Sequence, residues 1–135
     1  MIALDTSVVI DLLREASRGQ VGAVTRHIGR FPESPIALPV FVLCELEAGA
    51  ARARDPEGER KRVRSLADRC EILYPDETFA PRFGEVSAHV LGRGTPRPTM
   101  DLLIAVSAIC AGAKLLTRDR RGFSSIPGLV LESIE

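Results

Sequence analysis

Residues 2–13 of the chain read IALDTSVVIDLL, a short apolar run followed by an acid and then by an amphipathic pattern. The run at 2–4 predicts a short strand that ends at Asp5. Thr6 or Ser7 can cap the helix that follows, because hydroxyl side chains accept hydrogen bonds from the first backbone N–H groups of a helix. A strand that leads directly into a helix is the repeating unit of a parallel α/β sheet.

The same alternation continues along the chain. Strands are predicted at 36–38, 72–74 and 115–117, with a further candidate at 129–131. Helices are predicted at 17–29, 39–54, after the turn at 55–58, at 76–91 and at 100–111. Because the strand runs are continuously apolar, we expect both faces of the sheet to be covered. We therefore predict an α/β protein, a single domain over 1–135 with three α/β/α layers and a central parallel sheet of four to five strands.

Composition excludes several classes of protein. The chain of 135 residues is 45% hydrophobic and 27% charged, which is typical of a folded domain and excludes disorder. It has 18 Lys and Arg against 18 Asp and Glu, and this balance argues against a protein that holds polyanions by bulk charge alone. Aromatic residues make up 4% with no Trp, so the stacking platforms of many single-strand binders are missing.

The three cysteines and the N-terminus indicate a cytoplasmic protein. Cys44, Cys70 and Cys110 form no C-x-x-C pair and sit among apolar neighbours, so we expect buried, unbridged thiols in a reducing compartment. The N-terminal residues lack the basic region of a signal peptide. The longest apolar stretch, at 102–113, is shorter than the ~20 residues of a membrane span.

Four carboxylates stand where ligands or apolar neighbours are expected. Asp5 ends the first strand and Asp119 follows the strand at 115–117 closely, and ligands of parallel α/β folds collect at the carboxyl ends of strands. Glu45 and Asp101 lie within helical patterns that are otherwise apolar. Burying a lone carboxylate costs free energy, so each of these acids needs compensation.

Each acid also has a purely structural interpretation. Asp5 could only cap a helix, and Asp101 lies in a first helical turn, where the helix dipole favours negative charge. Asp119 could be a turn residue paired with arginine, and Glu45 could pair with Arg52. Neighbouring Glu47 is interpreted as a solvated acid.

Taken together, the four acids favour a metal site. Like charges brought together raise one another's pKa unless a cation neutralises them. Hard oxygen ligands without His or Cys select Mg²⁺ or Mn²⁺ over zinc, and His27 and His89 lack metal-ligand spacing. No Ser-His-Asp set, P-loop or dinucleotide-binding motif is present.

The order of these motifs resembles the PIN-domain ribonucleases, closest to the VapC toxins of bacterial and archaeal toxin–antitoxin pairs. The residues that carry the resemblance are Leu4-Asp5-Thr6-Ser7, Glu45-Leu46-x-x-Gly49, Asp101 with Ile104-Ala105, and Leu116-Thr117-Arg118-Asp119. The resemblance covers essentially the whole chain. Two departures are the proline-rich segment at 96–101 and the highly charged stretch at 57–64.

The resemblance implies a PIN-like fold with a four-acid pocket that binds one or two Mg²⁺ or Mn²⁺ ions and cleaves RNA through a metal-activated water. Asp5 and Asp119 are then expected as direct metal ligands, and Glu45 and Asp101 complete the site directly or through water. Thr6 and Thr117 are expected to support the acids from beside the site. Thr117 could equally be a strand-end residue that only packs.

The resemblance also implies partners. Arginines on the loops near this edge are candidates for guiding the RNA backbone, with solvated surface as the alternative for each: Arg93, Arg97, Arg118, Arg120 and Arg121. A VapB-like antitoxin and a homodimer are expected, and no membrane partner. The alternatives are a catalytically silent PIN-like module that binds RNA or protein, and a DNA nuclease that uses the same pocket. A dehalogenase-type phosphatase would need a D-x-D pair, which Asp5-Thr6-Ser7 lacks.

Overall fold

A computed structural model describes residues 1–134. Its five strands form one parallel sheet in the order β3-β2-β1-β4-β5, which confirms the predicted fold class. The strands are β1 (Ile2–Leu4), β2 (Ile36–Pro39), β3 (Glu71–Leu73), β4 (Lys114–Thr117) and β5 (Leu131–Ser133). Because β1 and β4 lie at the centre of the sheet, the residues that follow them emerge side by side.

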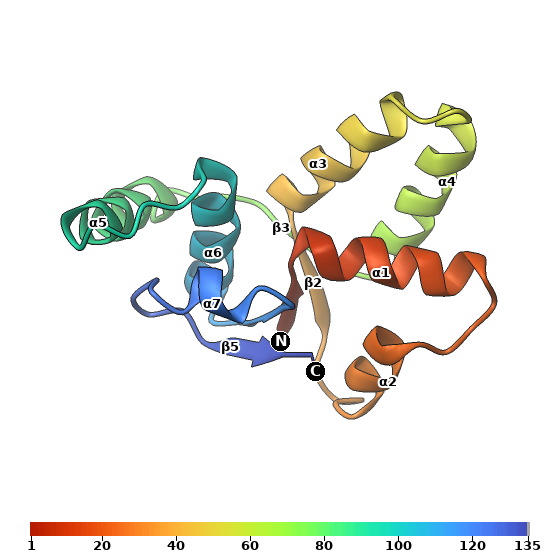
Figure 1. The fold of residues 1–135 in the computed structure, drawn as a ribbon, viewed down its shortest axis with the longest axis horizontal. Helices are drawn as coiled ribbons and strands as arrows, with labels where there is room; N and C mark the ends of the chain where they lie inside the picture. Colours follow the sequence, from red (N-terminus) through yellow and green to blue (C-terminus); the bar gives the residue numbers. More distant parts are fainter. Residues whose placement is uncertain (135) are drawn as a thin grey trace.

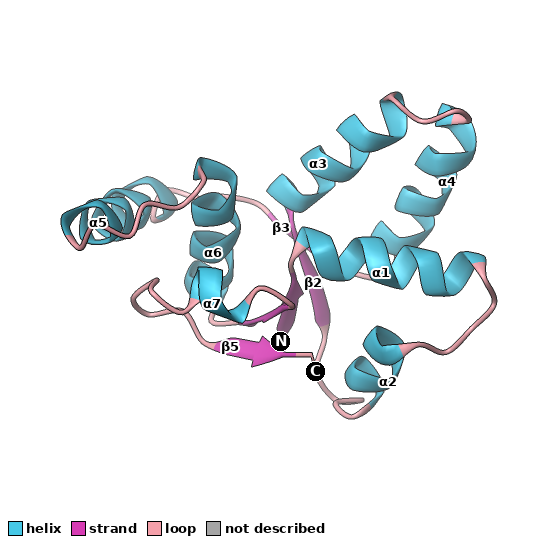
Figure 2. Ribbon diagram, in the orientation of Figure 1, coloured by secondary structure: helices cyan, strands magenta, loops and turns pink. Residues whose placement is uncertain are grey.

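Seven helices surround the sheet (Figures 1 and 2). They are α1 (Thr6–Ser17), α2 (Ala23–Gly29), α3 (Val40–Ala51), α4 (Pro56–Ala67), α5 (Phe79–Gly92), α6 (Thr99–Ala111) and α7 (Arg120–Phe123). Helices α1 and α2 lie on one side of the sheet and α6 on the other (Figure 1). The α3–α4 pair extends beyond the sheet next to α1, while α5 packs on the outside of α6.

The core explains why these segments take these positions. The central strands are fully enclosed, with Leu4, Leu115 and Leu116 at 0% exposure. Helix α6 is buried over most of its circumference, since Leu102, Ile104, Ala105, Val106, Ser107 and Ala108 are all buried. A helix that is apolar nearly all round is expected in such a position. The carboxyl edge of the sheet is therefore held between two packed layers.

Several predicted boundaries differ from the structure. The helix predicted at 17–29 is split, because α1 continues to Ser17 and a loop then leads to α2 at Ala23. Gly19 takes a left-handed φ of 60°, which ends the first helix. Thr99 is the first residue of α6 rather than its cap, and α5 begins only at Phe79. The fifth strand lies two residues later than predicted.

The expectation of buried cysteines is wrong for two of the three. All three thiols are free, but Cys44 and Cys110 are exposed and Cys70 is half-buried. Cys44 and Cys110 lie on the outer faces of α3 and α6, which the apolar character of those helices did not reveal. A thiol has a small polar group and is tolerated in either position.

Candidate functional site

Asp5 is the central acid of the carboxyl edge. It is 7% exposed, and its Oδ1 accepts a hydrogen bond from the Thr6 backbone N–H at 2.7 Å. Its Oδ2 accepts from the Thr117 hydroxyl at 2.8 Å and from the Ser7 hydroxyl at 3.2 Å. Burial raises the pKa of Asp5 above its ordinary value although these hydrogen bonds oppose it, and the charge of Asp101 raises it further. Burial therefore destabilises the charged form of Asp5 relative to an acid in water.

Thr117 joins the two acids that follow the central strands. Its side chain is fully buried at the end of β4, beside β1, where Leu4 pairs with Leu116. The Thr117 hydroxyl donates to Asp5 and accepts from the Asp119 backbone N–H at 2.9 Å. Both contacts satisfy a hydroxyl that is fully buried, and they also tie the Asp5 carboxylate to the backbone of Asp119.

Asp119 begins the short helix α7. Its Oδ1 accepts a hydrogen bond from the Gly122 backbone N–H at 2.9 Å, which caps that helix. The Asp119 side chain is 54% exposed. The helix cap confirms a structural role for Asp119, and its role as a metal ligand stays a prediction.

Arg97 connects Asp101 to Asp119. One nitrogen of its guanidinium, Nη2, donates to Asp101 Oδ2 at 2.7 Å and to Asp119 Oδ2 at 3.2 Å. Asp101 lies in the first turn of α6, as predicted, and its charge is close enough to Asp5 to affect the pKa of that acid. Three of the four predicted acids therefore meet at one edge, and a cationic side chain stands between two of them.

Glu45 reaches this edge through Thr6. It lies one turn into α3, half-buried, and its Oε1 accepts a hydrogen bond from the Thr6 hydroxyl at 2.6 Å. Thr6 thereby contacts Asp5 through its backbone and Glu45 through its side chain. No ion pair between Glu45 and Arg52 occurs within residues 1–134. The structure links all four predicted acids in one continuous network of hydrogen bonds and ion pairs.

The donor set suits a hard divalent cation, but the side chains are not arranged as a metal shell. Over residues 1–134, no three His, Cys, Asp or Glu side chains are grouped so that they could hold an ion as they stand. The donors at the edge are all carboxylate or hydroxyl oxygens, which Mg²⁺ and Mn²⁺ prefer. The positively charged guanidinium of Arg97 lies between two of these carboxylates, Asp101 and Asp119, and pairs with both. The chemistry therefore fits a metal, provided that the acids move closer together.

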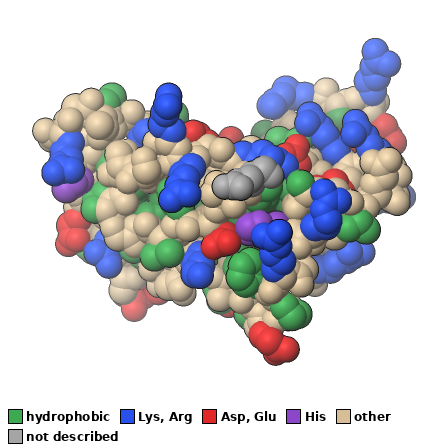
Figure 3. Space-filling view, turned by 60° about the horizontal axis from the view of Figure 1, so that its bottom comes forward, with side chains coloured by type: hydrophobic (Ala, Val, Ile, Leu, Met, Phe, Trp, Pro, Cys, Tyr) green, Lys and Arg blue, Asp and Glu red, His purple; other side chains and the backbone are tan. Residues whose placement is uncertain are grey.

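The other arginines named from the sequence are mostly exposed. The Arg118 Nε donates to Asp11 Oδ2 at 2.5 Å, which ties this residue to α1. Arg93, Arg120 and Arg121 are exposed. In the view of Figure 3, Lys and Arg side chains are spread over the surface with Asp and Glu side chains between them. Their role as RNA contacts stays a prediction.

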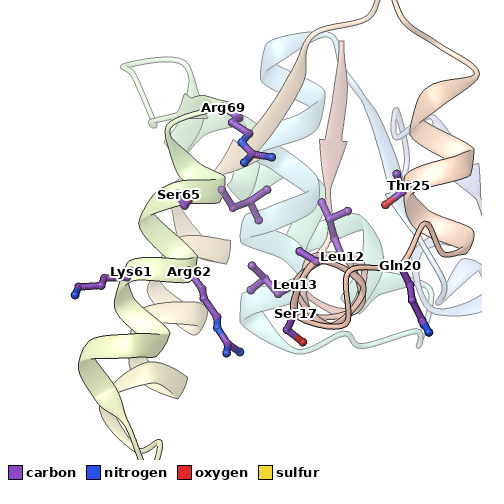
Figure 4. Close-up of a pocket in the computed structure, with 11 residues that line it drawn as sticks. Leu12, Leu13, Ser17, Gln20, Thr25, Lys61, Arg62, Ser65 and Arg69 are labelled. Carbon is purple, nitrogen blue, oxygen red and sulfur yellow. The ribbon is translucent and has the colours of Figure 1, made fainter.

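A groove begins beside Glu45 and runs along α1. One section of about 330 Å³ includes Thr6 and Glu45 and runs between α1, α3 and α4. A second section of about 490 Å³ lies between α1 and α4. The two share Leu13, Ser17 and Arg62, so they adjoin. In Figure 4, Leu13 points from α1 toward α4, which contributes Arg62, Ser65 and Arg69 to the lining.

Two residues at the site escaped the sequence analysis. Ser7 was considered only as a helix cap, yet its hydroxyl contacts Asp5. A Cβ atom on Gly122 would collide with the Asp119 carboxylate and with the Arg97 guanidinium, so a larger residue would displace these two side chains from their present positions. The signal for Gly122 was its position three residues after Asp119, the spacing of a side-chain cap.

Comparison with known proteins agrees with this geometry. The model of the PIN domain family matches residues 2–129. The chain is 31% identical over 98 residues to "Ribonuclease VapC2" of Rickettsia felis, which covers 73% of each chain. It is 31% identical over 99 residues to "tRNA(fMet)-specific endonuclease VapC" of Salmonella typhimurium, covering 73% of this chain and 75% of that one. The chain belongs to the PIN domain family and, within it, to the VapC group.

Solved structures resemble the whole chain. The fold matches a chain in the crystal structure of VapBC2 from Rickettsia felis bound to a DNA fragment from its promoter, with a TM-score of 0.88 and 25% identity over 100% of both chains. A chain of DNA-bound VapBC from Salmonella typhimurium gives a TM-score of 0.87 and 26% identity, covering 98% of this chain and 96% of that one. In the described part of this protein, no helix has the length and apolar character to span a membrane.

Proposed function

We propose that this protein is a metal-dependent endoribonuclease and the toxin of a toxin–antitoxin pair. The observation that carries the proposal is the convergence of Asp5, Asp101 and Asp119 from three different elements on one edge of the sheet. Relatives that are named ribonuclease or endonuclease support cleavage of RNA. The carboxylates, with no His or Cys among them, support Mg²⁺ or Mn²⁺ as the cofactor.

Each residue has a defined part in this proposal. Asp5, Asp101 and Asp119 would hold the metal, and Glu45 would join them directly or through water. A divalent cation bound there supplies a deprotonated water near neutral pH and offsets charge on the phosphate. Thr117 fixes Asp5 relative to Asp119, and Thr6 fixes Glu45 relative to Asp5. These hydroxyls keep the acids oriented, which metal ligands require.

The test is cleavage of a labelled single-stranded RNA and a labelled structured RNA by the purified protein. Cleavage should occur in millimolar Mg²⁺ or Mn²⁺ and stop in excess EDTA. Internal cuts would identify an endonuclease, because an exonuclease shortens the substrate from one end. Undiminished cleavage in EDTA would contradict the proposal.

The same assay separates the two alternatives. A single-stranded DNA of the same sequence tests the DNA nuclease, which would cut it at least as fast as RNA. A catalytically silent module would bind RNA in a gel-shift assay without cutting it in either metal. The acids at the sheet edge favour catalysis over silence, because a silent module has no need to keep carboxylates near one another.

An antitoxin is the partner that the groove along α1 suits. The solved relatives named above are VapBC complexes. The groove has an apolar wall at Leu12, Leu13 and Leu66 and a cationic rim at Lys61, Arg62 and Arg69. Such a surface fits an amphipathic segment with acidic residues, since the apolar wall and the cationic rim would both find complementary groups.

The neighbouring reading frame provides the binding test. Its product should copurify with this protein and inhibit RNA cleavage. Arg69→Glu should weaken the complex, whereas Arg26→Glu, outside the groove, should not. Equal affinity for both variants would place the antitoxin elsewhere. Homodimer formation and a cytoplasmic location stay predictions, and light scattering of the purified protein tests the first.

A further inference from the structure

We propose that Arg97 is an internal cation that competes with the divalent metal for Asp101 and Asp119 and thereby sets the metal affinity of the site. This inference rests on the proposed function, since it assumes that the acids bind a metal. Arg97 was expected from the sequence only as an RNA contact. Its position between the two carboxylates gives it a different role in the metal-free protein.

Three of the four carboxylate oxygens of Asp101 and Asp119 already have partners in the metal-free protein. Asp119 uses Oδ1 to cap α7 through the Gly122 N–H, and Arg97 contacts its other oxygen, Oδ2. The same nitrogen of Arg97 holds Oδ2 of Asp101. A divalent cation held by Asp101 and Asp119 would lie close to the guanidinium that already neutralises part of their charge. The guanidinium and the metal would therefore compete for the same two carboxylates.

The Arg97 guanidinium is partly buried, but one of its buried N–H groups has no hydrogen-bond partner within the described structure. Its side chain is 23% exposed, and its carbon Cζ lies 6.0 Å from the centre of the buried Phe123 ring. Nε is buried and has no hydrogen-bond partner within the described structure. A buried donor without an acceptor costs free energy, and this cost is removed when the group returns to water. Arg97 thus stabilises the metal-free site and can still be displaced.

The surrounding backbone accommodates both positions. Arg97 ends a loop whose residues 93–96 are exposed, and Gly94 takes a left-handed φ of 69°. On the other side, Gly122 leaves room for the guanidinium, because a Cβ there would collide with it. The guanidinium of Arg97 therefore fits beside Gly122, and the exposed loop before Arg97 adjoins solvent.

The test measures Mn²⁺ binding by electron paramagnetic resonance in the full-length protein without RNA. Arg97→Gln removes the competing charge, and Arg93→Gln is the matched control, because it removes the same charge from an exposed position in the same loop. The Kd of Arg97→Gln for Mn²⁺ should fall about tenfold, as expected if Arg97 occupies the site in most metal-free molecules. Arg93→Gln should change it by less than about twofold, because exposed charges interact weakly through water.

Thermal unfolding of the same variants provides an independent readout. Without metal, Arg97→Gln should have a lower Tm than wild type, because two neighbouring carboxylates lose their cation. With saturating Mn²⁺ the difference should shrink or reverse. Equal or weaker Mn²⁺ binding by Arg97→Gln would overturn the inference, since Arg97 would then assist the metal site.

The wild-type protein gives a test that needs no variant. Titration with diamagnetic Mg²⁺ should shift the NMR signal of the Arg97 Nε–H and speed its exchange with water, because the guanidinium leaves its buried position. An unchanged Arg97 signal while signals near Asp5 respond would overturn this inference and leave the proposed function intact. If neither wild type nor Arg97→Gln binds Mn²⁺, the inference and the proposed metal dependence both fail.

Discussion

The two ends of α1 each hold a carboxylate, and their surroundings differ in kind. Glu15, near the C-terminal end, accepts hydrogen bonds from the backbone N–H groups of Val24 and Thr25 and so caps α2. Burial raises the pKa of Glu15, but these hydrogen bonds outweigh it and lower the pKa overall. At the other end, burial prevails over the hydrogen bonds and raises the pKa of Asp5.

This difference separates an acid whose charge the fold satisfies from the acid that we propose as a metal ligand. The charge of Glu15 is satisfied within the fold, because the first N–H groups of a helix offer the positive end of its dipole. Asp5 also caps a helix, yet it is more deeply buried and lies near a second carboxylate. A buried acid whose charged form is destabilised is suited to bind a cation, because the cation favours that charged form.

The rate of RNA cleavage should show the largest difference between substitutions at Asp5 and at Glu15, the carboxylates at the two ends of α1. Asp5→Asn is expected to lower the rate of RNA cleavage by at least about a hundredfold, since a carboxylate that binds the metal is lost. Circular dichroism should show an unchanged fold, because asparagine has nearly the same shape. Glu15→Gln is the matched control and should keep the wild-type rate within about twofold. Equal losses in both variants would remove the distinction.

Mn²⁺ should raise the free energy of unfolding only when Asp5 is present, whereas Glu15 should not matter for this effect. At a Mn²⁺ concentration 100 times Kd, binding adds about 2.7 kcal/mol to the free energy of unfolding. For a chain of this length that corresponds to a Tm rise of roughly 10 °C. Glu15→Gln should show the same rise and Asp5→Asn none. A Tm that ignores Mn²⁺ in the wild type would contradict a metal site in the native state.

Substitution of Glu15 should lower the free energy of unfolding whether or not metal is present. Glu15→Ala removes the acceptor for the N–H groups of Val24 and Thr25, and loss of a helix cap costs about 1 kcal/mol. The expected Tm decrease is about 4 °C. Differential scanning fluorimetry can detect it, with Glu33→Ala, in an exposed loop position, as the control. No decrease would mean that water replaces the cap at no cost.

The smallest effect is an opposite dependence on pH at the two ends. Because folding lowers the pKa of Glu15, its contribution to stability is present above its unfolded pKa and is lost as the pH falls through its folded pKa. Because folding raises the pKa of Asp5, its contribution is present below its unfolded pKa and is lost as the pH rises through its folded pKa.

Urea unfolding between about pH 3 and pH 7 measures both effects. Compared with the wild type, Glu15→Gln should lose less stability at the acid end of this range. Asp5→Asn should lose less stability as the pH rises from the acid end. The same pH profile in all three proteins would show that neither carboxylate titrates differently in the folded state.

The fold was predictable because its signals are local. Short apolar runs marked the central strands, and the acid at the end of the first run marked the carboxyl edge. Helix boundaries were less accurate where the ending depends on a backbone conformation, as at Gly19. The loop between α1 and α2 also depends on the cap from Glu15, a contact between residues nine and ten positions apart.

The site was predictable as a set of residues and not as an arrangement. Spacing placed Asp5 and Asp119 after strands, and that placement is confirmed. The hydrogen bond from Thr6 to Glu45 joins residues 39 positions apart, and no local sequence pattern predicts it. Arg97 and Asp101 are four positions apart, a helical ion-pair spacing, but the prolines in the loop between α5 and α6 obscured it.

The anomalous scattering of Mn²⁺ in crystals of the wild-type protein tests directly whether the carboxylates after the central strands require a divalent cation. A Mn²⁺ peak within bonding distance of Asp5, with Asp101 or Asp119 as a second ligand, is the predicted result. A fully active protein whose crystals bind Mn²⁺ only at other positions would contradict it.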